Sequence, residues 1–349
     1  MHVLWIDGVE PGEAIRLSGS KMGRLAELAT TGTKVPLAFA VTVEAFNEHF
    51  QSTGLDDAIE FELRGIDLTD HVGLEVVADR IRGRIVSTQM SQELADQIVD
   101  AYEELCDKAS DLNIPTAVRS SATGEDGSDS SFAGIFDTFL GVSGSPQVLE
   151  AVRACWASLF SPRAIAYRAR HGISHHLMPM AVGVVELVHA RASGVAFSIH
   201  PVSGKRDRVV IESSWGWGEA VVQGLVTPDH FEVGKADRRI LKRNINDKKV
   251  VSAFDFSAGH VTETNMPERL RLRSSLDDEQ IAAITHAVLA IEDHYGYPVD
   301  IEWVLDRHRR EGEPIAIVQT RPVTVVEDVA PVAYDPMALA NKFIFSKGR

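Results

Sequence analysis

A short stretch of small and hydroxyl residues constrains this chain more than any other segment. Residues 119–126 read RSSATGED and residues 131–136 read SFAGIF, so one arginine precedes two loops rich in serine, alanine and glycine. Glycine lets a backbone approach an anion closely, and successive amides can point at phosphate oxygens. A guanidinium can bind phosphate through two parallel hydrogen bonds. The pattern alone leaves two interpretations open, an ordinary loop and a phosphate-binding loop.

The composition is that of a globular protein with an acidic surface. The chain has 349 residues, 44% hydrophobic and 24% charged, and a formal net charge of −15. This length is sufficient for two lobes or domains. Nucleic-acid-binding proteins usually carry a basic stripe, so the charge argues against a nucleic-acid partner. It does not argue against ATP, because a few local cations can hold its phosphates.

The sequence shows no targeting signal and no metal-binding cysteine motif. Cys106 and Cys155 form no CxxC pair, so we expect inert, buried thiols. The first seven residues, MHVLWID, are charged too early for a signal peptide, and no run of about 18 apolar residues is present. We therefore expect a cytoplasmic protein without a membrane anchor.

A second candidate phosphate contact lies near the start of the chain. Residues 18–20, Ser-Gly-Ser, precede Lys21 at what the pattern predicts to be a helix N-terminus. Helix N-termini attract anions and disfavour lysine, so a bound phosphate would explain this lysine. A solvated lysine is the alternative interpretation.

The last third of the chain predicts a β-hairpin over residues 300–306 and 315–321. Alternation along each strand puts certain side chains on a shared face. These are Asp300, Glu302 and Val304 on the first strand, and Ile317, Gln319 and Arg321 on the second. A carboxylate and a carboxamide on neighbouring strands can supply oxygen ligands to Mg²⁺. An edge hairpin with ordinary polar side chains is the alternative interpretation.

Together, these segments resemble the nucleotide-binding domain of the phosphoenolpyruvate synthase, pyruvate phosphate dikinase and rifampicin phosphotransferase family. The resemblance covers about residues 10–326 and rests on the strings GSKMGRLAEL, VRSSATGED, SFAGIFDTFL, SSWGWGEAVVQG, VTPD, DIEWVLD and IAIVQTRPVT. It implies an α+β chain with an ATP-grasp fold of two lobes and nucleotide bound between them. Residues 1–178 would form the lobe with the phosphate-binding loops. Residues 179–326 would form the lobe with the adenine pocket and the magnesium hairpin, and residues 327–349 a tail.

The resemblance also implies ATP and Mg²⁺ as cofactors and gives roles to the matching residues. It implies phosphate contacts from Lys21, Arg119, Gly134, Thr138 and Arg321, of which the three cations would serve catalysis by neutralising charge. Glu302 and Gln319 would hold Mg²⁺. The backbone at Glu186 and Val188 would pair with the adenine edge, and Trp217 stands where the family commonly has leucine.

Enzymes of this family split ATP into AMP and phosphate and pass the β-phosphoryl group through a histidine to an acceptor. That histidine lies in a separate swivelling domain, and its motif surrounds none of the 13 histidines of this chain. We therefore expect a partner subunit that carries the phosphohistidine domain and the site for a small-molecule acceptor. Specifically, we expect this chain to be the ATP-binding subunit of a two-subunit aryl phosphate synthase, an enzyme that phosphorylates phenol or cresol.

Several alternatives stay open at this point. The chain could be a truncated piece of a longer enzyme, although the initiator-like Met1 favours a natural subunit. It could also be a stand-alone ATP-grasp ligase that forms an acyl phosphate, or a non-catalytic module that senses adenylates.

Overall fold

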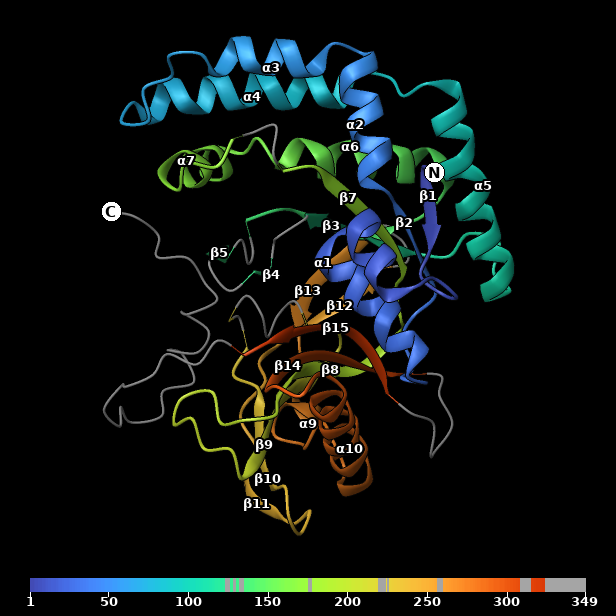
Figure 1. Ribbon diagram of the computed structural model, residues 1–349. Coiled ribbons are helices and arrows are strands. Elements are labelled where there is room, and N and C mark those ends of the chain that lie inside the picture. The colour runs from blue at the N-terminus through green and yellow to red at the C-terminus, as the bar shows by residue number, and fades with distance from the viewer. Residues whose placement is uncertain are drawn as a thin grey trace. The chain divides into compact units, whose positions relative to one another are not determined.

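The chain contains both helices and strands, with more residues in helices, in agreement with the predicted α+β class. The computed structural model describes residues 1–122, 126–127, 130–131, 135–174, 178–218, 224, 226–255, 260–307 and 315–323. Its contacts divide the chain into two compact units (Figure 1). The first comprises Met1–Thr30 and Leu37–Leu187, and the second comprises Thr31–Pro36 and Val188–Arg349.

The first unit is built on a five-stranded antiparallel sheet in the order β1-β2-β7-β3-β6. Its strands are Val3–Trp5 (β1), Ala38–Val41 (β2), Thr116–Ala122 (β3), Thr138–Val142 (β6) and Met180–Glu186 (β7). The first six residues of β7 are all buried, as expected for an apolar central strand. Strands Asp126–Gly127 (β4) and Ser130–Ser131 (β5) pair separately.

Seven helices of the first unit surround this sheet within the described residues. They are Pro11–Thr30 (α1), Val43–Ser52 (α2), Leu55–Leu63 (α3), His71–Ser87 (α4), Gln92–Ala109 (α5), Ser145–Ser158 (α6) and Pro162–Arg170 (α7). The hydroxyls of Thr42, Ser91 and Ser161 each accept a hydrogen bond from an amide of the first helical turn, which is the usual reason for a helix to begin there. Trp156 of α6 is fully buried and donates to the carbonyl of Met180, which fixes α6 against β7.

A glycine interrupts α1 midway. Gly19 has φ 73° and ψ 176°, and a β-carbon there would lie 2.0 Å from the carbonyl oxygen of Ser121. Directly after the break, the amide of Met22 donates to Oγ of Ser121 at 3.1 Å. The helix start expected at residues 18–20 is therefore a break within a longer helix, and it begins a second helical segment beside the end of β3.

The second unit contains a six-stranded antiparallel sheet in the order β11-β10-β9-β8-β14-β15. The strands are Ala190–Phe197 (β8), Arg208–Trp215 (β9), Asp229–Gly234 (β10), Ile240–Asn244 (β11), Val299–Asp306 (β14) and Ala316–Pro322 (β15). Strands Val250–Asp255 (β12) and His260–Asn265 (β13) form a separate hairpin, followed by the short helix Glu268–Arg271 (α9).

Helix Asp278–Tyr295 (α10) packs against β14, β9 and β8, on one face of this sheet (Figure 1). Asp277 and Gln280 form a reciprocal capping box at its start, and Gly296 ends it in the left-handed region. Among the helices that the structure describes, none is long and apolar enough to cross a bilayer.

A buried ion pair ties β10 to the segment that leads into α10. Lys248 and Asp229 are fully buried and lie 2.5 Å apart. Asp229 also accepts from the amide and the hydroxyl of Ser275, at 2.8 and 2.7 Å, and the Ser275 hydroxyl lies 2.6 Å from that of Ser213. A buried carboxylate needs such a set of donors, because its lost hydration is otherwise not replaced.

Replacing Lys248 by methionine should destabilise the protein, because it leaves the buried carboxylate of Asp229 without its cation. We expect the free energy of unfolding to fall by about 3–5 kcal/mol in urea denaturation. The neighbouring Lys249 is exposed, so Lys249→Met should change that free energy by less than about 0.5 kcal/mol. Equal stability of the two variants would contradict the role assigned to the ion pair.

Two glycines of α1 should respond to alanine with opposite signs. Gly19→Ala forces a β-carbon into Ser121 and an unfavourable φ, so we expect a loss of at least about 2 kcal/mol in the free energy of unfolding. A β-carbon at Gly12 would meet nothing within 4 Å, so Gly12→Ala should add about 0.5–1 kcal/mol. Thermal or urea denaturation of both variants checks this, and a neutral Gly19→Ala would refute the account of the break.

Candidate functional site

Two of the predicted phosphate contacts lie opposite each other in the first unit. Arg119 on β3 is the cross-strand partner of Thr138 on β6 and, on its other side, of Gly183 on β7. Cross-strand partners project from the same face of a sheet. The structure therefore places the side chains of Arg119 and Thr138 next to each other on one face of the sheet. Gly134, the predicted loop amide, lies outside the described residues, as does most of the loop at 123–134.

The second segment of α1 begins on that same face. Ser121 is two residues beyond Arg119 on β3, so the two side chains share a face. Because the Ser121 hydroxyl accepts from the amide of Met22, the start of this segment, with Lys21, lies over the face that carries Arg119 and Thr138. A helix N-terminus next to an arginine and a hydroxyl is a set of groups suited to an anion.

The two residues predicted to meet adenine each have one backbone group engaged within the protein. The amide of Glu186 donates to the carbonyl of Leu37 at 2.8 Å. The carbonyl of Val188 accepts from the indole Nε1 of Trp217 at 2.9 Å. A backbone contact to a ligand would therefore use the carbonyl of Glu186 and the amide of Val188. Trp217, which stands where the family commonly has leucine, thus fixes the backbone at Val188.

In the second unit, the predicted metal ligands are direct cross-strand neighbours. Glu302 on β14 is opposite Gln319 on β15, and Asp300 is opposite Arg321. Nε of Arg321 donates to Oδ2 of Asp300 at 2.7 Å. Asp300 is 4% exposed and received no role from the sequence. The alternation had placed it on the face of Glu302, but only the register of the hairpin shows that it orients Arg321.

One detail of the predicted hairpin is wrong. The register shifts between Glu302 and Trp303, so that Ile317 is opposite Trp303. Ile317 therefore shares the face of Trp303, and not that of Gln319 and Arg321 as strict alternation predicted. An extra residue in one strand changes which side chains are opposite each other, and sequence alternation alone does not reveal it.

Glu302 and Gln319 belong to a row of side chains that crosses the whole six-stranded sheet. From β11 to β15 the paired positions are Asn244, His230, Glu212, Val195, Glu302 and Gln319. A second row lies two residues away from the first on every strand, on the same side of the first row. It consists of Lys242, Glu232, Val210, Phe197, Asp300 and Arg321. Ser213 and Asp229, which hold the segment before α10, occupy alternate positions and so project to the opposite face. The face with the two rows is therefore the one that α10 does not cover.

Along β14 this face changes from charged to apolar. Val304 follows Glu302 by two residues and joins a small buried cluster with Val188, Ala190 and Ala316. Trp217 and Val318 pack against that cluster. From Asp300 to Val304 the strand advances about 13 Å. The face thus carries charged side chains at one end and an apolar cluster at the other, within the length of one extended small molecule.

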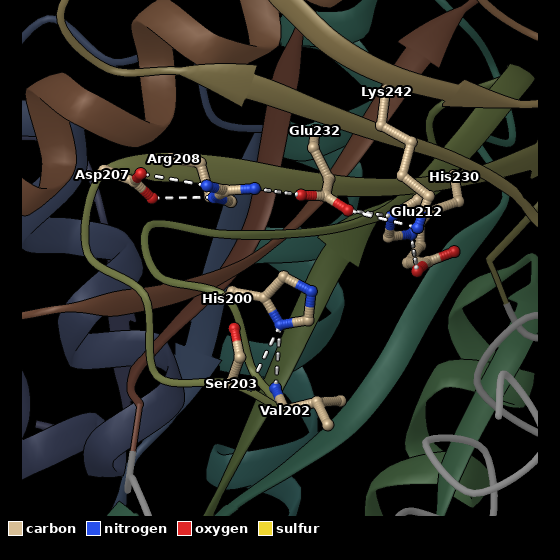
Figure 2. A network of polar contacts seen from close by, with 9 residues as sticks. All are labelled: His200, Val202, Ser203, Asp207, Arg208, Glu212, His230, Glu232 and Lys242. Atoms are coloured by element: carbon tan, nitrogen blue, oxygen red, sulfur yellow. Dashed lines mark hydrogen bonds and ion pairs between the residues drawn. The ribbon is translucent and has the colours of Figure 1, made fainter. Parts of the chain in front are cut away.

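The outer part of the two rows holds a network of buried charges (Figure 2). His230 is 1% exposed, and its Nδ1 and Nε2 lie 2.7 Å from Glu212 and 3.3 Å from Glu232. Glu232 also pairs with Arg208 at 2.7 Å and with Lys242 at 3.3 Å. The sequence signalled none of these contacts, because the residues come from three strands.

The environment of this network shifts the pKa values of its members. Burial lowers the pKa of His230, but the hydrogen bonds and charge of Glu212 and Glu232 outweigh burial, so the net shift is upward. Burial raises the pKa of Glu232, but hydrogen bonds from Arg208, His230 and Lys242 lower it to about 2. Burial lowers the pKa of nearby His200, whose Nδ1 accepts from the amides of Val202 and Ser203 in a turn (Figure 2). His200 is thus accounted for as a turn residue.

The donor chemistry of the hairpin fits a magnesium ion bound together with phosphates. Among the residues that the structure describes, no group of three or more histidine, cysteine, aspartate or glutamate side chains could hold a metal. Glu302 and Gln319 provide one carboxylate and one carboxamide. Mg²⁺ commonly takes one or two protein oxygens and completes its shell with water and substrate phosphate. Binding of a cation at Glu302 and Gln319 would therefore require that the nucleotide phosphates supply further ligands.

Comparison with known proteins agrees with these features. Residues 15–338 match the family model described as pyruvate phosphate dikinase, AMP/ATP-binding domain. The chain is 38% identical over 312 residues to a probable phosphoenolpyruvate synthase of Methanothermobacter thermautotrophicus, covering 89% of this chain and 44% of that protein. It is 39% identical over 337 residues to the phosphoenolpyruvate synthase of Escherichia coli, covering 93% and 42%. The chain spans less than half the length of these relatives, and it belongs to the family of the pyruvate phosphate dikinase AMP/ATP-binding domain.

Proposed function

We propose that this chain is the ATP-binding part of a dikinase-type phosphotransferase. Such an enzyme splits ATP into AMP and phosphate and passes the β-phosphoryl group to a histidine and then to a small acceptor. The observation that carries the proposal is the face of the six-stranded sheet that α10 does not cover. There the pairs Glu302–Gln319 and Asp300–Arg321 adjoin the apolar cluster around Val304, in the order in which a nucleotide presents phosphates and base.

In this proposal the cations neutralise the phosphates and the hydroxyl positions them. Lys21 and Arg119 act from the first unit, where Thr138 lies beside Arg119. Arg321 acts from the second unit, and Asp300 holds its guanidinium in a fixed direction. Phosphoryl transfer requires little covalent chemistry from a protein, so positioning and electrostatic stabilisation would account for most of the catalysis.

Glu302 and Gln319 would hold Mg²⁺, which supplies charge neutralisation on the phosphate oxygens when it is bound. The carbonyl of Glu186 and the amide of Val188 would pair with the adenine edge. The ring would rest on the apolar cluster that includes Val304. With these roles both units contribute to one nucleotide site, as in an ATP-grasp fold whose lobes extend over about residues 1–178 and 179–326, with a tail at 327–349.

The proposal assigns the remaining chemistry to another polypeptide. None of the 13 histidines has the sequence context of the family's phosphate carrier. A partner subunit would supply the swivelling phosphohistidine domain and the acceptor site. Phenol or a cresol is the acceptor to test first, and the cytoplasm is the compartment we propose.

Replacing Arg119 by alanine should weaken ATP binding, because a charge-assisted contact to phosphate is lost. A contact of about 1.5–3 kcal/mol corresponds to a Kd increase of roughly 10- to 100-fold, measured by calorimetry in magnesium buffer. Arg64 lies after α3 with a side chain that is 72% exposed, so Arg64→Ala should leave the Kd unchanged. If both variants bind as the wild type does, the phosphate site is not at Arg119.

The chain alone should phosphorylate no small acceptor, and a mixture with a phosphohistidine-domain partner should do so. The nucleotide product should be AMP, and the phosphoryl group on the acceptor should come from the β position. ATP labelled separately at the β and γ phosphates distinguishes the possibilities by mass spectrometry. Formation of ADP, or transfer of the γ label to the acceptor, would exclude a dikinase mechanism. Product formed by the isolated chain would exclude the division between two subunits.

A further inference from the structure

A second carboxylate, that of Glu212, lies on the face of the six-stranded sheet that carries Glu302, and in the same row of side chains. Glu212 on β9 and Glu302 on β14 are both paired with Val195 of β8, one on each side. No register shift occurs at these positions, so all three side chains project from the same face. Val195 is only half-buried, and it is shorter than the two glutamates that flank it.

The spacing of the two carboxylates suits a pair of divalent cations. Two strand intervals separate their backbones by about 9.5 Å. Two magnesium ions about 3.5–4 Å apart, each about 2.1 Å from its carboxylate oxygen, need those oxygens about 8 Å apart. A slight lean of both side chains over Val195 meets that requirement. Adjacent strands would hold the carboxylates too close together for such a pair.

His230 holds Glu212 in a defined orientation. Its Nδ1 lies 2.7 Å from Oε1 of Glu212, and the ring is 1% exposed. The ring is fixed in turn from its other side by Glu232, which Arg208 and Lys242 bind (Figure 2). Oε2 of Glu212, the other oxygen of the carboxylate, has lone pairs suited to a hard cation.

Such a buried network of charges is costly to form, because its members lose hydration on folding. Apolar residues at the same positions would give comparable or greater stability, so stability alone does not account for the network. Glu212, at the end of this network, lies on β9. This strand is next to β8, which carries Val195, and two strands from β14, which carries Glu302.

We propose that Glu212, oriented by His230, is a further carboxylate of the metal–nucleotide site and binds a second divalent cation beside the one at Glu302. The inference rests on the proposed function, since nucleotide phosphates must bridge the two ions. Glu212 would be a ligand and His230 a positioning residue. Ligand carboxylates commonly receive a hydrogen bond of this kind, and its loss weakens metal affinity 10- to 100-fold.

The test counts Mn²⁺ ions bound to the full chain in the presence of a non-hydrolysable ATP analogue, from the electron paramagnetic resonance signal of free Mn²⁺. We expect two ions in the wild type. Glu212→Gln should weaken one of them at least tenfold, and Glu212→Asp, which withdraws the carboxylate by one methylene, should weaken it as well. Glu279→Gln is the control, because Glu279 is an exposed carboxylate at the start of α10, the helix that covers the opposite face of the sheet. It should keep both ions.

The role of His230 has its own pair of variants. His230→Leu should weaken the same ion as Glu212→Gln does, and His230→Gln, which retains a hydrogen-bond donor, should restore most of the affinity. Equal weakening by both would contradict the positioning role. Thermal denaturation confirms that each variant is folded.

The outcomes separate this inference from the proposed function. Analogue binding with the same number and affinity of ions in the wild type and in Glu212→Gln overturns the role of Glu212 and leaves the proposed function intact. No binding of the analogue by the folded wild type overturns both.

Discussion

The register of four neighbouring strands, β9, β8, β14 and β15, decides which side chains this protein can bring together. Each pair is antiparallel, and no shift interrupts the row from Glu212 through Val195 and Glu302 to Gln319. Gly194, next to Val195, allows the close approach of β8 and β9, since a β-carbon there would lie 1.9 Å from the carbonyl oxygen of Glu212. A slip of one residue would turn Glu302 and Gln319 toward the face that α10 covers.

The covered face of the sheet stabilises this register. Apolar residues of α10 pack there, and the fully buried pair of Asp229 and Lys248 fixes the segment that leads into the helix through Ser275. A register that moved these side chains to the opposite face would remove their apolar contacts with α10 and separate the ion pair. The charged face contributes less to stability, because its network of histidine, glutamate and arginine gives up hydration to form. One face of the sheet thus packs against α10, and the other carries the side chains to which the proposed function assigns roles.

The sequence predicted those features that depend on local pattern. Alternation placed Asp300 and Glu302 on one face, and the register of the hairpin agrees. The break at Gly19 was taken for a helix start, because helical residues continue on both sides of it and its cause is Ser121, about a hundred residues away. The position of Ile317 was wrong because a strand irregularity leaves no mark in the alternation. The link between His230 and Glu212 depends on how β9 and β10 pair, which no local pattern determines.

The central claim is that Glu302 and Gln319 bind a divalent cation together with a nucleotide. A crystal structure of the full chain with Mn²⁺ and a non-hydrolysable ATP analogue tests it most directly, because anomalous scattering locates manganese independently of the model. Our account predicts a manganese peak within bonding distance of the Glu302 carboxylate and the Gln319 carbonyl oxygen, bridged to phosphate oxygens. Bound analogue with manganese away from both residues would contradict it.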